Sequence, residues 1–65
     1  MTDMVLDDLS TRATTVLRDA VDGPITADTV RNLTRRYLLA TYRCGPIIAD
    51  EIIGWAKGRG IIIED

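Results

Sequence analysis

The chain has 65 residues, which is enough for one small domain with one modest hydrophobic core. Apolar residues make up 46% and charged residues 28%, proportions that fit a folded globule, while the net charge of −2 argues against a surface that clamps nucleic acid all round. A single cysteine, Cys44, and the absence of histidine exclude an internal disulfide and leave no set of zinc ligands. We therefore expect neither a metal nor a cofactor.

The N-terminus is acidic, with Asp3, Asp7 and Asp8 where a secretory signal would carry lysines. No apolar run approaches the roughly 18 residues that a membrane span requires. These features predict a cytoplasmic protein without a membrane segment. Residues 1–8 are too short for an independent element, and we expect them to form an arm that lies on the core.

The cationic residues are unevenly distributed. Almost all are arginines, and six lie in the central part of the chain: Arg12, Arg18, Arg31, Arg35, Arg36 and Arg43. Arginine makes bidentate hydrogen bonds to phosphate or carboxylate, and it enters narrow minor grooves better than lysine does. The distribution is consistent with a DNA-binding face and equally with a solvated, arginine-rich helix face.

The first predicted helix begins after Ser10, which is a good N-cap, with Leu9 before it as a possible staple residue. The helix ends at Asp22-Gly23-Pro24, a turn signature that no helix interior accepts. Its apolar residues recur at helical spacing: Ala13, Val16, Leu17 and Ala20. This is one amphipathic helix.

Residues 27–40 allow two interpretations. If one helix continues from a cap at Thr26, four residues share its apolar face: Ala27, Val30, Leu33 and Tyr37. Alternatively, Thr34 caps a second short helix that carries Leu38 and Leu39, with Arg35 and Arg36 outward. We favour two short helices over one long one.

The last predicted helix runs from Pro46 to Lys57, after a turn in which Gly45 supplies a positive φ. Its buried stripe comprises Ile48, Ile52 and Trp55 or Ala56, and Gly58 and Gly60 end it. The N–H groups of the turn and of the helix start form a small electropositive concavity where phosphate can sit. The isoleucines at 61–63 are strand-like without a second strand to pair with, so they pack across the helices or meet another molecule.

The segment from Gly45 to Ile52, G-P-I-I-A-D-E-I, resembles the second half of a helix-hairpin-helix motif, with Arg43 replacing the motif's first hairpin glycine. A longer pattern resembles the C-terminal domain of the bacterial RNA polymerase α subunit. It comprises Leu9-Ser10-Thr11-Arg12, Leu17-Arg18, Leu38-Leu39, Gly45, Asp50-Glu51-Ile52 and Ala56 to Ile61. The resemblance covers most of residues 9–61, with a residue or two inserted near Asp22 to Leu33, and leaves 1–8 as an arm and 62–65 as a tail.

The resemblance implies an all-α fold, a compact bundle of four to five short helices with a helix-hairpin-helix-like unit. In that family, the arginine at the position of Arg12 and the backbone around the hairpin glycine enter the minor groove of A/T-rich promoter DNA. It therefore implies DNA binding through Arg12, Arg18, Arg43 and Gly45. The chain departs from the family where phosphate contacts are made: the asparagine one turn after the arginine is Thr15, and the lysine and serine after the hairpin glycine are Ile47 and Ile48.

Two functions are consistent with these residues. The first is a transcription-associated module that contacts the backbone and minor groove of double-stranded DNA. The second is a protein-interaction module that has kept the fold, lost most of its DNA affinity, and presents isoleucines to RNA polymerase, a transcription regulator or another copy in a homodimer: Ile47, Ile48, Ile62 and Ile63. We do not expect an enzyme, because Asp50 and Glu51 point about 100° apart on a helix and Cys44 has no histidine to activate it.

Overall fold

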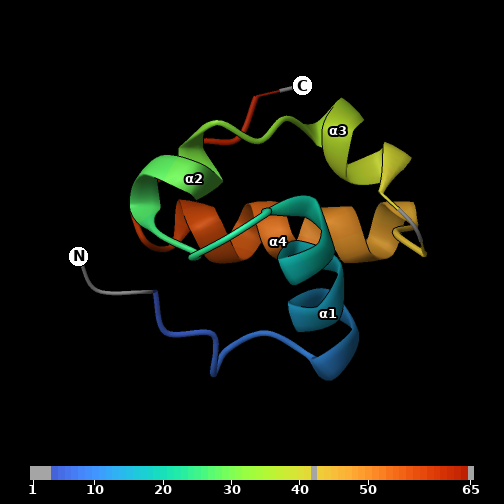
Figure 1. Cartoon of the computed structure of the whole chain (residues 1–65), viewed down its shortest axis with the longest axis horizontal. Helices are drawn as coiled ribbons and strands as arrows, with labels where there is room; N and C mark the ends of the chain where they lie inside the picture. The colour runs from blue at the N-terminus through green and yellow to red at the C-terminus, as the bar shows by residue number, and fades with distance from the viewer. Residues whose placement is uncertain (1–3, 42, 65) are drawn as a thin grey trace.

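The structure is a computed structural model that describes residues 4–41 and 43–64 (Figure 1). These residues contain four helices joined by short connections. They are α1 (Thr11–Ala20), α2 (Ala27–Arg31), α3 (Arg35–Ala40) and α4 (Pro46–Lys57). The predicted all-α class is confirmed. Residues 1–3 of the expected arm and residue 65 of the expected tail lie outside the described residues.

Helix α1 begins and packs as predicted. The hydroxyl of Ser10 accepts a hydrogen bond from the N–H of Ala13 at 3.2 Å and so caps the first turn. The helix ends before Val21, in the turn predicted from Gly23 and Pro24. Its four predicted core residues are all buried: Ala13, Val16, Leu17 and Ala20.

Residues 27–40 form two short helices, which confirms the favoured interpretation. The N–H of Thr29 donates to the hydroxyl of Thr26 at the start of α2, and the N–H of Tyr37 donates to the hydroxyl of Thr34 at the start of α3. The second cap shifts the helical phase. As a result Tyr37 does not continue the buried face of α2, and its side chain is 53% exposed.

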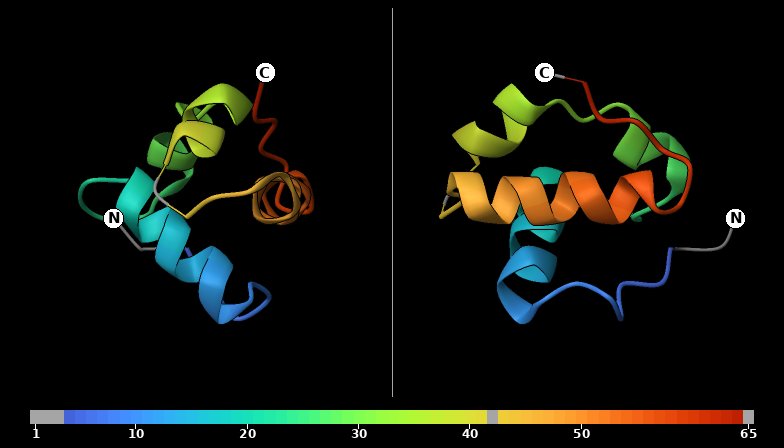
Figure 2. Two further views of the ribbon diagram at one scale, coloured as in Figure 1. Left: turned by 90° about the vertical axis from the view of Figure 1, so that its right-hand side faces the viewer. Right: turned by 180° about the vertical axis from the view of Figure 1, so that it is seen from behind.

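Helix α4 is the longest element, and both α1 and α3 pack against it (Figures 1 and 2). Its buried face comprises Ala49, Ile52, Trp55 and Ala56. The predicted stripe is therefore correct except at Ile48, which is half-buried beside the core. None of the helices in the described ranges combines the length and the apolar character needed to cross a membrane.

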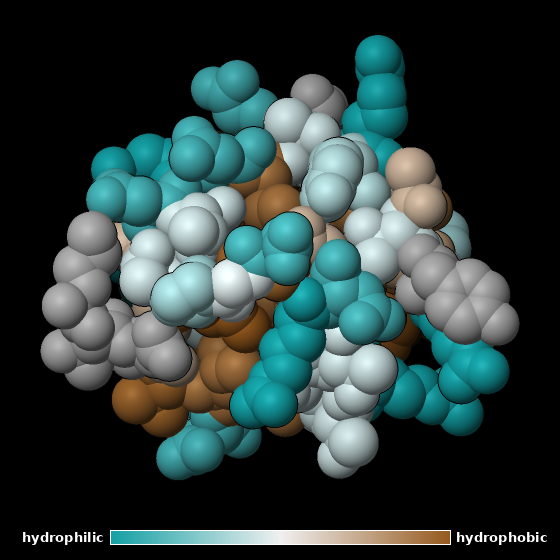
Figure 3. Space-filling model, viewed as in Figure 1, coloured by the Kyte–Doolittle hydropathy of each residue, from teal (hydrophilic) through white to brown (hydrophobic). Residues whose placement is uncertain are grey.

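The two ends of the described chain lie on this core. The N–H of Met4 donates to the carbonyl of Ile25 at 2.7 Å, and apolar atoms gather around this arm on the face shown in Figure 3. At the other end, Ile61 and Ile63 are buried while Ile62 is 63% exposed. The tail thus packs across the helices, and it also finds a backbone partner that the sequence did not predict: the N–H of Arg35 donates to the carbonyl of Glu64 at 2.7 Å.

Candidate functional site

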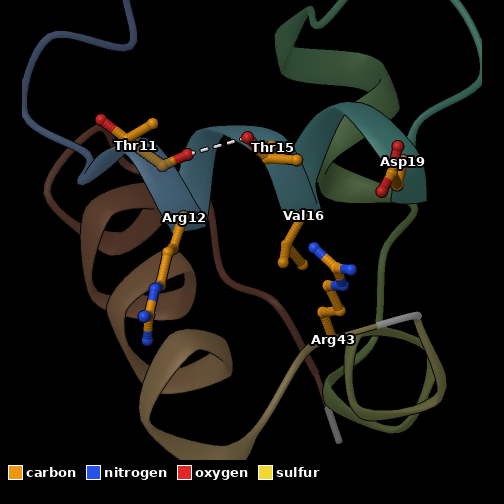
Figure 4. Close-up of a pocket in the computed structure, with 6 residues that line it drawn as sticks. All are labelled: Thr11, Arg12, Thr15, Val16, Asp19 and Arg43. Carbon is orange, nitrogen blue, oxygen red and sulfur yellow. Dashed lines mark hydrogen bonds between the residues drawn. The ribbon is translucent and has the colours of Figure 1, made fainter.

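A surface hollow of about 360 Å³ lies between α1 and the connection from α3 to α4. One flank of α1 lines it, and Arg43 enters it from the connection (Figure 4). We call it the arginine hollow and define it by its lining: Thr11, Arg12, Thr15, Val16, Asp19 and Arg43. It brings together two of the four residues predicted to bind DNA, Arg12 and Arg43.

The helical repeat of α1 explains the lining from that side. Residues at i, i+3, i+4 and i+7 share a helix face, so Arg12, Thr15, Val16 and Asp19 follow one another along the hollow. The hydroxyl of Thr15 donates to the carbonyl of Thr11 at 3.0 Å, which turns it back onto the helix. The hollow is therefore cationic near the start of α1 and carries a carboxylate near its end.

Arg12 is exposed, and the ion pairs found between described residues do not include it. Asp8, an acid close to Arg12 in the sequence, instead pairs with Arg59 at 2.8 Å. Figure 4 shows the side chain of Arg12 extending away from α1, while Arg43 points from the connection toward Val16. The two residues thus line the hollow from different segments, and their guanidinium groups lie on different sides of Val16.

The backbone of Arg43 has φ 65°, the one positive φ at a non-glycine position in the described chain. Gly45, for which we predicted the positive φ, has φ −95°, and that prediction is wrong. The reason is that Gly45 is the N-cap of α4, and an N-cap residue takes an extended conformation. The left-handed residue of the turn falls two positions earlier, at Arg43.

The start of α4 adds a second electropositive feature close to Arg43 in the chain. Gly45 has no side chain with which to cap the helix, and the first intrahelical bond runs from the N–H of Ala49 to the carbonyl of Gly45 at 3.0 Å. The N–H groups of Ile47 and Ile48 precede that bond, where the helix dipole places partial positive charge. A Cβ built on Gly45 would meet nothing within 4 Å, so the backbone here is open to approach.

The remaining predicted site residues are dispersed. Arg18 lines a different hollow, with Asp7 and Asp22, and Gly45 does not line the arginine hollow itself. Among the isoleucines proposed for a partner, Ile47 is 82% exposed and Ile62 is exposed, but Ile48 is half-buried. Ile63 is buried in the core at 6% exposure, so its side chain is not available to a partner.

Four of the lining residues were not among those predicted to bind DNA: Thr11, Thr15, Val16 and Asp19. Thr15, Val16 and Asp19 follow Arg12 at i+3, i+4 and i+7, so they share its helix face. Once Arg12 was proposed as a site residue, this spacing could have predicted that they line the same site. Val16 was predicted only as a core residue, and it is buried, but it also lines the hollow.

Cys44 packs against the core just before the start of α4, and its Sγ lies 3.6 Å from the carbonyl oxygen of Gly45. Burial raises the pKa of the Cys44 thiol, which keeps it protonated and unreactive near neutral pH. In the described ranges, no three histidine, cysteine, aspartate or glutamate side chains gather as metal ligands would.

Comparison with known proteins adds no relative: the sequence matches no protein-family model and no curated protein, and the structure matches no solved structure. The likeness to the C-terminal domain of the RNA polymerase α subunit therefore stays a prediction that depends on the residues of this chain alone.

Proposed function

We propose that the chain is a non-enzymatic, transcription-associated module that binds duplex DNA weakly, through the arginine hollow and the start of α4. The observation that carries this proposal is that Arg12 and Arg43 line the same hollow, although they belong to different segments. The uncapped start of α4 follows Arg43 within the same turn. Two guanidinium groups and a helix N-terminus form a surface that favours phosphate.

The backbone at Arg43 supports the same proposal. A left-handed conformation costs a residue with a side chain about 1–2 kcal/mol, a cost that glycine avoids. The chain nevertheless carries arginine at this position, with φ 65°. Strained backbone of this kind persists where the surrounding structure holds it, and it is concentrated at binding and catalytic sites.

The expected affinity is low because three arginines outside the hollow pair with acids and add little to phosphate binding. Arg31 pairs with Asp28, Arg35 with Asp50 and Arg59 with Asp8. Each phosphate neutralised contributes about −0.9 to the slope of log K against log salt, so two arginines predict a slope of about −2. Binding should therefore be detectable at low salt and lost at high salt.

Fluorescence anisotropy with a short A/T-rich duplex, from about 50 to about 200 mM salt, tests the proposal. We expect Arg12→Ala and Arg43→Gly each to weaken binding and each to reduce the slope by about 1. Arg18→Ala is the matched control, because Arg18 lies on α1 but beside the other hollow. If neither Arg12→Ala nor Arg43→Gly changes the salt slope, or if Arg18→Ala changes it as much as they do, DNA does not bind at the arginine hollow.

A second candidate function is favoured by the exposure of Ile47 at 82% and Ile62 at 63%. Exposed isoleucines are typical of protein contacts, and the partner would be a polymerase, a regulator or a second copy of the chain. Sedimentation velocity over a wide concentration range tests the last of these. A monomer at every concentration, unchanged by Ile47→Asp and Ile62→Asp, would exclude self-association through either side chain.

A further inference from the structure

Ile47 is the most exposed of the large apolar side chains that the structure describes, at 82%. It follows Pro46 in the first turn of α4 and does not belong to the core. Its exposure is therefore not explained by packing within the chain. Ile47 does not line the arginine hollow itself but follows Arg43 closely in the chain, and an exposed isoleucine near arginines suits a ligand with both apolar and anionic parts.

The position of Ile47 follows from the helix repeat and one tertiary contact. Glu51 lies one turn further along α4 on the same face, and its carboxylate accepts hydrogen bonds from Ser10, the N-cap of α1. Ile47 therefore leaves α4 on the side that faces the start of α1, where Arg12 lies. Arg43 precedes it across the turn. The left view in Figure 2 looks onto this side, where the start of α4, the connection from α3 and α1 come together.

We propose that Ile47 enters the minor groove and wedges at a base step, while Arg12 and Arg43 hold the flanking phosphates. This inference rests on the proposed function and specifies how that site contacts its ligand. Proteins that insert isoleucine, leucine or phenylalanine between base steps unstack them partly and bend the duplex. Pyrimidine–purine steps such as TA, which A/T-rich DNA supplies, deform most easily.

Charge favours duplex DNA over a protein as the occupant. The minor groove of A/T-rich DNA is narrow and strongly negative, and it has apolar deoxyribose walls, which matches an isoleucine with arginines close by. A stable protein interface instead requires roughly 800 Å² on each partner, with an apolar centre. The other strongly exposed aliphatic side chains, Val5 and Ile62, belong to the arm and the tail, away from the first turn of α4.

The test combines salt-dependent binding with DNA bending, measured by energy transfer between dyes at the two ends of a duplex that carries a central TA step. Ile47→Ala should weaken binding about fivefold or more, leave the salt slope unchanged and reduce the bend, because an apolar contact releases no counterions. Ile47→Lys should increase the slope by about 1 and also reduce the bend. Ile62→Ala is the matched control and should change none of these quantities.

The outcomes separate this inference from the proposed function. If the wild-type chain shows no salt-dependent binding, both fail. If it binds and responds to Arg12→Ala, but Ile47→Ala binds and bends like the wild type, the wedge fails alone. If Ile47→Ala abolishes self-association in sedimentation and leaves DNA binding intact, Ile47 is a protein contact and the wedge is excluded. Circular dichroism of each variant confirms that the fold is retained.

Discussion

The carboxylate of Glu51 accepts two hydrogen bonds from Ser10, one from its backbone N–H at 2.7 Å and one from its hydroxyl at 3.0 Å. The hydroxyl of Ser10 in turn accepts from the N–H of Ala13, so a side chain of α4 completes the cap of α1. This contact joins residues far apart in the sequence. It also fixes the first turn of α1, and therefore Arg12, relative to the start of α4.

Glu51→Ala should lower the free energy of unfolding by about 1–2 kcal/mol, because it leaves the N–H of Ser10 without its charged acceptor. Asp50→Ala is the neighbouring control. It removes only a partly exposed ion pair with Arg35 and should cost about 1 kcal/mol or less. Urea denaturation of both variants measures the difference. Equal costs for the two would contradict the role given to the Ser10–Glu51 contact.

Arg43→Gly should stabilise the fold by up to about 1 kcal/mol while it weakens DNA binding. Glycine adopts the φ of 65° without strain, although part of this gain is lost to the greater entropy of the unfolded chain. Thermal denaturation and anisotropy on the same sample measure the two effects. A variant that is both less stable and unchanged in DNA affinity would show that Arg43 serves the fold alone.

Arg59→Ala should destabilise the chain by about 1 kcal/mol. Its guanidinium lies 4.9 Å from the centroid of the Trp55 ring, donates to the carbonyl of Trp55 at 3.3 Å and pairs with Asp8. The fluorescence emission of Trp55 should shift, because the substitution removes the guanidinium that lies over the indole ring. Arg36→Ala, at an exposed position on α3, is the control. Emission that is unchanged in Arg59→Ala would mean that Arg59 does not cover the ring in solution.

The thiol of Cys44 should react slowly in the folded chain, because burial raises its pKa. Between the ordinary thiol pKa and the raised one, the native state keeps a proton that the unfolded state has already lost. The resulting stabilisation is fully present below the ordinary thiol pKa and disappears as the pH rises through the raised one. Alkylation by iodoacetamide in buffer and in urea tests the first statement. The difference in stability between wild type and Cys44→Ala across alkaline pH tests the second, and a difference that does not change with pH would contradict it.

Much of the fold could be predicted from the sequence because local signals dominate it. The caps at Ser10, Thr26 and Thr34, the turn at Gly23 and the proline at the start of α4 each act within one or two helical turns. Helical spacing then identified most of the buried residues. Tyr37 is the instructive case: its burial depended on whether the helix was broken, and the cap at Thr34 decided that question.

The site was less predictable because it depends on contacts between distant segments. Nothing local indicates that Glu51 caps α1, or that Arg43 and not Arg18 joins Arg12. We predicted the positive φ at Gly45 because glycine is the usual residue with a positive φ. Gly45 is instead the N-cap of α4 and is extended, and the positive φ lies at Arg43. Likewise, the alternation of burial along 61–63 requires the packed core beneath the tail.

The most direct test of DNA binding at the arginine hollow is an amide chemical-shift titration of the labelled chain with an A/T-rich duplex at low salt. We predict that shifts concentrate on the first turns of α1, on residues 43–45 and on the first turn of α4, and that they vanish as salt is added. Amides around Arg18 and along the tail should remain in place. A titration that moves none of the amides around Arg12 and Arg43, or moves only those of another face, would contradict the account.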